Sequence, residues 1–303
     1  AESSTQRGGK VRLDGSSTVF PMSEAVAEEY NAVEPRVRVT VGVSGTGGGF
    51  KKFINGETDI NDASRPIRAS EMEKAVVGGI KVIELPVAFD GLSVIVNRKN
   101  DWVDHLTIAE LNKIWQPDSV VNTWKDLRPE WPDRKIRLYG PGTDSGTFDY
   151  FTKAVNGKEQ ASRPDFTASE DDNVLVQGIS GDLDSLGYFG FAYYKENRDK
   201  LKIVPIDGGT GPIAPTEETI NNGTYAPLSR PVFIYVNAAA LDKPQVASYV
   251  DFYITNAGAL SSEVGYIPLP QAVYDAAAAR VAAREHGTAY HGENRVADLA
   301  SDS

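Results

Sequence analysis

Apolar and polar positions follow two different periods along the chain, and the switches between them predict the order of its secondary structure. Val37, Val39, Val41 and Val43 alternate with polar or small residues, a period of two that indicates a β-strand. Between residues 21 and 30 the apolar side chains return at helical spacing instead. Because strand-like and helix-like spacing succeed each other through the sequence, we expect an α/β protein with largely parallel sheets.

The same reading predicts the remaining elements. Two strand-like runs are expected between residues 80 and 96, broken at Pro86 and at Asp90-Gly91. Thr107 and Glu110 have the spacing of a capping box at a helix start. Further helices are expected over 50–54, 71–77, 107–115, 148–155, 173–179, 245–255 and 271–284. Further strands are expected over 11–13, 136–139, 187–194, 201–206 and 232–236, the stretch 187–194 being rich in aromatic residues.

Three short turns rich in Gly, Ser and Thr lie where a predicted strand ends and a predicted helix begins. They cover residues 15–21, 44–50 and 142–148. A helix N-terminus offers unpaired N–H groups and the positive end of a dipole, which suits an anion. Such turns are also ordinary loop punctuation, but three at the same kind of junction favour one anion held from several sides. None has the ending of a nucleotide phosphate loop or the dinucleotide fingerprint, so a small anion is favoured over a nucleotide.

Charge and composition argue against several classes of ligand and partner. The net charge of −11 argues against nucleic acid, and no apolar run is long enough for a membrane helix. The absence of cysteine removes disulfides, thiol catalysis and Cys-based metal sites. His105, His286 and His291 lack metal-ligand spacing, so we expect neither a metal site nor a cofactor. Ala1-Glu2-Ser3-Ser4 fits the start of a mature chain from which a signal peptide is missing.

Charged residues near the turns suggest how an anion would be recognised. Arg65, followed by a proline, could bind an oxyanion with two parallel hydrogen bonds, or it could be a solvated surface charge. Asp62 and Asp144 could each accept a proton carried by the ligand, or they could cap a turn or pair with Arg65. Hydrogen phosphate carries such a proton near neutral pH and sulfate does not. Which aspartate would accept it stays open.

An enzymatic alternative uses Ser145 as the nucleophile of a phosphatase. Ser145 does not lie in a Gly-x-Ser-x-Gly elbow, and few histidines are available as a base. A binding protein for another oxyanion, such as molybdate or tungstate, and a phosphate-holding scaffold without a permease also remain open.

Five motifs taken together resemble one family. They cover residues 14–21, 44–50, 62–67, 144–147 and 187–193. In this order they are similar to the PstS family, the periplasmic phosphate-binding proteins of the high-affinity phosphate ABC transporter. The resemblance covers most of the chain. It implies the type II periplasmic-binding-protein fold, with two α/β lobes joined by two crossing strands and a ligand cleft between them.

The resemblance also implies the ligand-binding residues and the lobe boundaries. Lobe one would be residues 1–87 plus 236–303, and lobe two residues 88–235. Many members carry an arginine where this chain has Pro141, so Arg65 would replace that cation. The expected phosphate-binding residues are Ser17, Thr18, Val19, Ser44, Asp62, Ser64, Arg65, Ser145, Gly146 and Thr147, with Thr46 and Gly47 as further candidates.

Function and location follow from the same resemblance. We expect a non-enzymatic, periplasmic or otherwise extracytoplasmic monomer without cofactors. It would bind inorganic phosphate by hinge closure and deliver it to the membrane permease of a phosphate ABC transporter.

Overall fold

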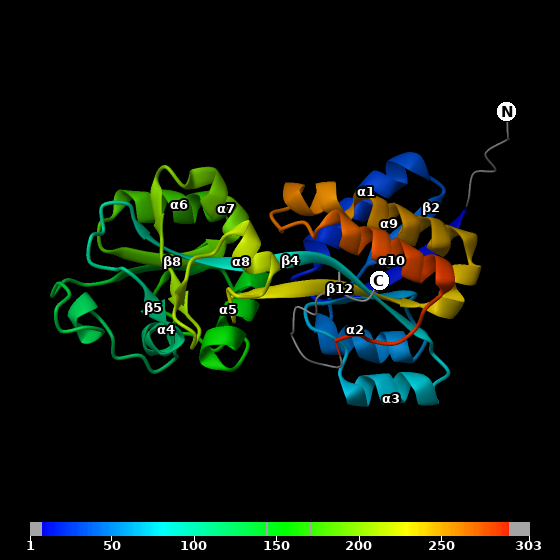
Figure 1. Ribbon diagram of the computed structural model, residues 1–303, viewed down its shortest axis with the longest axis horizontal. Helices are drawn as coiled ribbons and strands as arrows, with labels where there is room; N and C mark the ends of the chain where they lie inside the picture. Colours follow the sequence, from blue (N-terminus) through cyan, green and yellow to red (C-terminus); the bar gives the residue numbers. More distant parts are fainter. Residues whose placement is uncertain (1–7, 144, 170, 291–303) are drawn as a thin grey trace. The chain divides into compact units, whose positions relative to one another are not determined.

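The chain forms two compact units in the computed structural model, which describes residues 8–143, 145–169 and 171–290 (Figure 1). Unit 1 contains Ala1–Phe89 and Arg230–Ser303, and unit 2 contains Asp90–Ser229. Each unit combines β-strands with helices that cover them, so the expected α/β class is confirmed. The expected lobes divide the chain at nearby positions, and their action as closing lobes stays a prediction.

Unit 1 is a mixed sheet with helices on both faces. Its strands lie in the order β2-β1-β3-β12-β4; β1 is parallel to β2 and β3, whereas β12 is antiparallel to β3. Helices α1 and α9 cover one face, and α2 and α3 the other (Figure 1). Its elements are β1 (Gly9–Gly15), α1 (Phe20–Val33), β2 (Val37–Val41), α2 (Gly45–Ile54), β3 (Ile60–Ala63), α3 (Ala69–Val77), the first part of β4 (Val82–Asn97), β12 (Ser229–Asn237), a 3-10 helix (Ala238–Asp242), α9 (Pro244–Glu263) and α10 (Gln271–Ala283).

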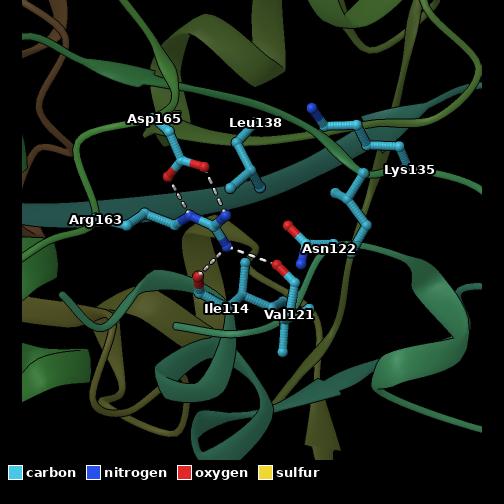
Figure 2. Close-up of a pocket in the computed structure, with 8 residues that line it drawn as sticks. Ile114, Val121, Asn122, Lys135, Leu138, Arg163 and Asp165 are labelled. Carbon is cyan, nitrogen blue, oxygen red and sulfur yellow. Dashed lines mark hydrogen bonds and ion pairs between the residues drawn. The ribbon is translucent and has the colours of Figure 1, made fainter. Parts of the chain in front are cut away.

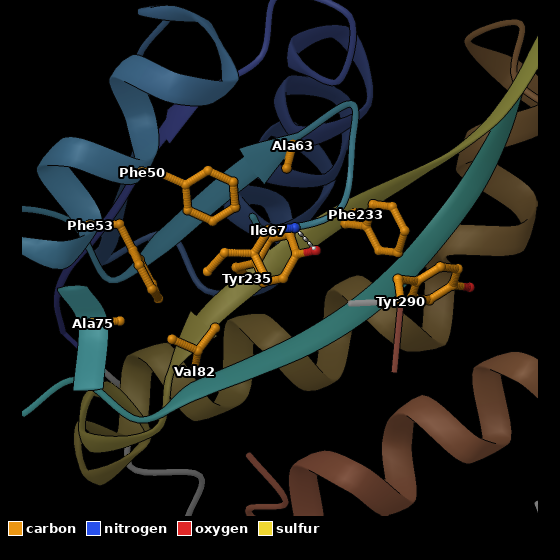
Figure 3. Close-up of a cluster of buried hydrophobic side chains, with 9 residues drawn as sticks. All are labelled: Phe50, Phe53, Ala63, Ile67, Ala75, Val82, Phe233, Tyr235 and Tyr290. Carbon is orange, nitrogen blue, oxygen red and sulfur yellow. Dashed lines mark hydrogen bonds between the residues drawn. The ribbon is translucent and has the colours of Figure 1, made fainter. Parts of the chain in front are cut away.

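Aromatic side chains dominate the core of unit 1 beneath α2 and α3. Phe50 packs edge-on against Tyr235, and Phe233 packs edge-on against Tyr290 (Figure 3). The Tyr235 hydroxyl accepts the Ile67 N–H at 2.9 Å and donates to the buried Glu84 carboxylate at 2.8 Å. This network fixes the loop after β3, which carries two of the expected ligand residues.

Unit 2 also carries a mixed sheet. Strand β6 is parallel to β7 and β8, and β4 is antiparallel to β8 and β9. Helix α6 covers one face of this sheet, and α4 and α5 the other (Figure 1). Beyond β4 its elements are β5 (Leu106–Thr107), α4 (Ile108–Trp115), a 3-10 helix (Trp124–Asp126), β6 (Arg137–Pro141), α5 (Gly146–Asn156), β7 (Thr167–Ser169), α6 (Asp172–Gly181), β8 (Ser185–Gly190), α7 (Phe191–Asn197), β9 (Leu201–Ile203), β10 (Ile206–Asp207), β11 (Pro212–Ile213) and α8 (Glu217–Asn221).

Three predicted strands had wrong boundaries, one of them the expected strand 201–206, which is divided into β9 and β10. The expected break in the stretch 80–96 is absent, because β4 runs without interruption through Pro86 and Gly91 and is buried along its whole length. A side chain at Gly91 would place its Cβ 2.7 Å from Ile220 Cδ1, so this glycine serves close packing and not a turn. The aromatic stretch 187–194 is a strand only to Gly190, after which α7 begins at Phe191.

The signals at helix ends were more reliable. The Glu110 N–H donates to Thr107 Oγ1 at 3.0 Å, and the Thr107 N–H donates to Glu110 Oε2 at 2.9 Å. This confirms the predicted capping box. In the part of the chain that the structure describes, no helix combines the length and the apolar character needed to cross a bilayer.

Candidate functional site

The first turn joins β1 to α1 and folds back on itself. Ser16 Oγ accepts the Thr18 N–H at 3.1 Å, and Ser16 O accepts the Phe20 N–H at 3.0 Å. No hydrogen bond among the described residues uses the N–H of Ser17 or of the buried Val19. These two amides, at the start of α1, therefore have the free donors predicted from the sequence.

Thr18 is engaged by side chains from far along the chain. Arg230 Nη2 donates to Thr18 Oγ1 at 3.0 Å, and the Tyr266 hydroxyl donates to Thr18 O. Sequence reasoning missed both partners, because no local pattern connects residues more than 200 positions apart. Arg230 thus brings a cation to the first turn that no sequence motif predicted.

The second Gly-rich motif, residues 44–50, is not a separate loop but forms the N-terminal part of helix α2. Ser44 is the N-cap residue but makes no side-chain capping bond, so its oxygen does not compete for the first helical N–H groups. One of the glycines of this helix, Gly49, is required by close packing. A Cβ at Gly49 would lie 2.0 Å from Asn61 Oδ1 and 2.6 Å from Gly15 Cα. Helix α2 can therefore approach the ends of β1 and β3 only with glycine there.

Ser44 is bound to Asp14 at the end of β1. The Ser44 hydroxyl donates to Asp14 Oδ1, and Lys52 Nζ donates to Asp14 Oδ2 at 2.6 Å. Burial by itself raises the pKa of Asp14, but the hydrogen bonds from Lys52 and Ser44 together with the Lys52 charge hold it below its usual value. Asp14 is therefore a carboxylate with a fixed partner on each oxygen.

Asp62 is enclosed inside unit 1. Its carboxyl group accepts the Ser23 hydroxyl at 2.9 Å, and Ser23 Oγ also contacts the Tyr253 hydroxyl at 2.9 Å. Burial raises the pKa of Asp62 to about 8, although the Ser23 hydrogen bond opposes the rise; the charge of Asp14 adds to it. The raised pKa favours the protonated form of this carboxyl group near neutral pH, whereas the sequence suggested a charged acceptor. Its role toward a ligand stays a prediction.

Ser64 and Arg65 follow β3 beside the N-terminus of α2. Thr46 Oγ1 accepts the Ser64 N–H at 3.1 Å and lies 3.1 Å from Ser64 Oγ, so these two candidates are neighbours. Arg65 Nη2 would lie 3.7 Å from a Cβ at Gly47. Its guanidinium donates twice to Glu71 and lies over the Phe50 ring. Arg65 is thus near the N-terminus of α2 but already shares an ion pair with Glu71.

The third turn belongs to unit 2, between β6 and α5. Ser145 is the N-cap of α5, and its Oγ accepts the Thr147 N–H at 3.2 Å. Gly146 and Thr147 form the first turn of the helix and are half-buried, as is Ser145. Pro141 ends β6, and Asp144 lies outside the described residues.

The structure therefore gathers seven of the ten predicted ligand residues in unit 1. Ser44 and Ser64 lie at the N-terminus of α2, and Ser17 to Val19 at the start of α1. The other three share the N-terminus of α5 in unit 2. All three predicted turns lie at strand-to-helix junctions, as expected. Sequence reasoning missed the partners Ser23, Lys52, Glu71 and Arg230, since which charges pair is decided by packing.

A small cavity in unit 2 is not a second anion site. It has a volume of about 20 Å³ and is lined by Arg163, Asp165 and Lys135, among others (Figure 2). That volume has room for about one water molecule. The Arg163 guanidinium is already bound by Asp165 and by the carbonyl oxygens of Ile114 and Val121. This arginine therefore ties three segments together, and most of its donors are already used.

The histidines form no metal site within the described residues. No cluster of three or more His, Asp or Glu there is arranged to hold a metal ion. His105 Nδ1 lies 3.1 Å from Asp104, and His286 is exposed. His291 lies outside the described residues.

Comparison with known proteins gives the class and then the family. A family model described as a PBP superfamily domain matches residues 1–257. A crystal structure from Planctomyces limnophilus, described as "a possible phosphate binding protein", is 48% identical and superposes with a TM-score of 0.89 over 92% of this chain and 99% of that one. The fold and the three junctions thus define a type II periplasmic-binding protein.

Two curated relatives narrow the class. Protein SphX of Synechococcus elongatus is 51% identical over 304 residues, which cover 99% of this chain and 89% of the relative. The phosphate-binding protein PstS of Staphylococcus saprophyticus is 40% identical over 268 residues, which cover 88% of this chain and 82% of the relative. This chain belongs to the PstS family.

Proposed function

We propose that this chain binds inorganic phosphate outside the cytoplasm and delivers it to the permease of an ABC transporter. The observation that carries the proposal is the set of three strand-to-helix junctions, each with hydroxyl or backbone N–H donors, in a chain that belongs to the PstS family. Helix N-termini and hydroxyl groups can bind an anion through neutral donors, and Arg65 would add one cation.

In this proposal units 1 and 2 are the two lobes, and both contribute to one phosphate. Ser17, Thr18, Val19, Ser44, Asp62, Ser64 and Arg65 belong to one lobe, and Ser145, Gly146 and Thr147 to the other. The binding event would close the lobes about the crossing strands β4 and β12. We further propose that the protein acts as a periplasmic monomer and not as an enzyme.

The phosphatase alternative is less well supported. Ser145 Oγ serves as the N-cap acceptor of α5, and among the described residues no histidine nitrogen is bonded to it. A nucleophilic serine needs such a base within hydrogen-bond reach. We expect no turnover of p-nitrophenyl phosphate; turnover that Ser145→Ala abolishes would support the enzyme instead.

Titration calorimetry tests the proposal directly. Phosphate, sulfate and molybdate are titrated separately into the purified chain at about pH 7.5, where hydrogen phosphate carries a proton and sulfate does not. We expect saturable binding of one phosphate per chain, with sulfate and molybdate weaker by at least tenfold. Absence of phosphate binding, or tighter binding of molybdate, would overturn the assignment.

A further inference from the structure

Asp14 and Ser44 form a polar pair in which the Ser44 hydroxyl hydrogen is donated to the Asp14 carboxylate. Asp14 is only 6% exposed, and each of its carboxylate oxygens has a partner. Oδ1 accepts the Ser44 hydroxyl, and Oδ2 accepts Lys52 Nζ at 2.6 Å. The ammonium group of Lys52, two turns along α2, keeps Asp14 ionised; a carboxylate can only accept hydrogen bonds.

This pairing determines what Ser44 can offer to a ligand. A serine hydroxyl has one hydrogen and two acceptor lone pairs. The hydrogen is donated to Asp14, and the backbone N–H of Ser44 is donated to Gly15 O at 3.1 Å. Ser44 is nevertheless exposed at the N-cap of α2. Its outward-facing function is therefore that of a hydrogen-bond acceptor.

We propose that Asp14 makes Ser44 an acceptor within the phosphate site, so that Ser44 selects an anion that carries a proton. This inference rests on the proposed function and assigns its specificity to a residue pair. Hydrogen phosphate can donate its O–H to Ser44. Sulfate at neutral pH has no hydrogen, so its oxygen would face the lone pairs of Ser44 and leave both groups unsatisfied.

The alternative acceptor in unit 1 is less suited to this task. Asp62 is fully buried and already bonded to Ser23, and burial raises its pKa. Asp14 itself has no oxygen without a partner. A neutral acceptor such as Ser44 also avoids placing a carboxylate against a divalent anion, since direct repulsion between the two would weaken binding.

Asp14→Asn gives the sharpest test because it keeps the shape of the side chain. The Lys52 ammonium group can face only the oxygen of the introduced amide, so the NH₂ of that amide must face Ser44. Ser44 then accepts from the introduced NH₂, and its own hydrogen is released to point outward. The substitution should turn Ser44 from an acceptor into a donor without removing an atom from the site.

The experiment compares phosphate and sulfate affinities, at the same pH as the calorimetry above, for the wild type, Asp14→Asn, Ser44→Ala and Ser17→Ala. Circular dichroism first shows that each variant is folded. We expect the phosphate-to-sulfate affinity ratio to fall at least tenfold in Asp14→Asn, with sulfate bound more tightly than by the wild type. Ser44→Ala should lower the ratio through weaker phosphate binding alone. Ser17→Ala is the matched control, since it should weaken both anions and keep their ratio.

The result that overturns the inference is an unchanged ratio in both Asp14→Asn and Ser44→Ala. If Asp14→Asn does not fold, the exposed Ser44→Ala variant alone decides. Failure of the wild type to bind phosphate is a different result, which would reject the proposed function itself.

Discussion

Arg65 and Glu71 form a two-pronged ion pair across the turn that leads from β3 into α3. The Nη1–Oε2 distance is 2.9 Å and the Nη2–Oε1 distance is 2.8 Å. Burial opposes the charge on Glu71, but the hydrogen bonds from Arg65 and from the Arg68 N–H lower its pKa below the usual value. The residue expected to supply the cation therefore has its orientation fixed and its charge partly neutralised. Its remaining N–H groups can still serve an anion beside α2.

Substitution of Arg65 tests whether this cation contributes to binding. Arg65→Ala should weaken phosphate binding by more than tenfold, because hydrogen bonds to charged groups contribute about 1.5–3 kcal/mol. Glu71→Gln is the matched control, since it keeps the guanidinium and removes only its counter-charge. It should change the affinity less than threefold in calorimetry. If the Arg65→Ala protein binds phosphate like the wild type, another residue supplies the positive charge at the site. Arg230 would then be the next residue to replace.

The raised pKa of Asp62 predicts an unusual dependence of the unfolding free energy on pH. Its pKa is about 8 in the folded chain and 3.8 in the reference state, so the folded state retains a proton that the unfolded state loses as pH rises. The contribution of this proton to the unfolding free energy is fully present below about pH 4. It declines by about 1.4 kcal/mol per pH unit as pH rises toward 8, and no further decline follows above that value.

Asp62→Asn removes this titration. Measured by urea denaturation, the unfolding free energy of the variant minus that of the wild type should increase by about 1.4 kcal/mol per unit between about pH 5 and 7.5. Asp251→Asn, which replaces an exposed carboxylate of the same unit, is the control for a general charge effect. A constant difference across this range would show that Asp62 ionises normally.

Tyr235 and Tyr290 offer a matched pair of hydroxyl groups in one core (Figure 3). Tyr235→Phe leaves the Ile67 N–H and the Glu84 carboxylate each without one partner, so it should lower the unfolding free energy by about 1–3 kcal/mol. The buried Tyr290 hydroxyl has no partner among the described residues, so Tyr290→Phe should change stability by less than about 0.5 kcal/mol. Equal effects in chemical denaturation would contradict the bonding arrangement.

Arg163 is expected to stabilise unit 2 without affecting the ligand (Figure 2). Arg163→Met keeps much of the apolar stem but leaves the carbonyl oxygens of Ile114 and Val121 without this donor, so it should cost about 2–4 kcal/mol. Asp165 is 64% exposed, so Asp165→Asn should cost less than about 1 kcal/mol. Thermal unfolding with and without phosphate separates stability from binding. A large loss of affinity in folded Arg163→Met would contradict a purely structural role.

The sequence alone predicted those features that depend on neighbours along the chain. The three strand-to-helix junctions, the capping box of Thr107 and Glu110, and the helix over 271–284 each depend on residue types within a few positions. The order of the motifs was sufficient to identify the family, because the three Gly-rich motifs each lie where a strand ends and a helix begins. These features depend on residues a few positions apart and not on which distant residues pair.

Only the tertiary structure decided how charges and hydroxyl groups are paired. Pro86 and Gly91 look like breaks in sequence, but β4 continues because its neighbours in each sheet outweigh local preference. Asp62 and Arg65 lie three positions apart, yet packing buries one carboxyl group beside Ser23 and joins the guanidinium to Glu71. Ser44 could equally be a donor in isolation. It is an acceptor here because the fold brings Asp14, thirty positions earlier, within reach of its hydrogen.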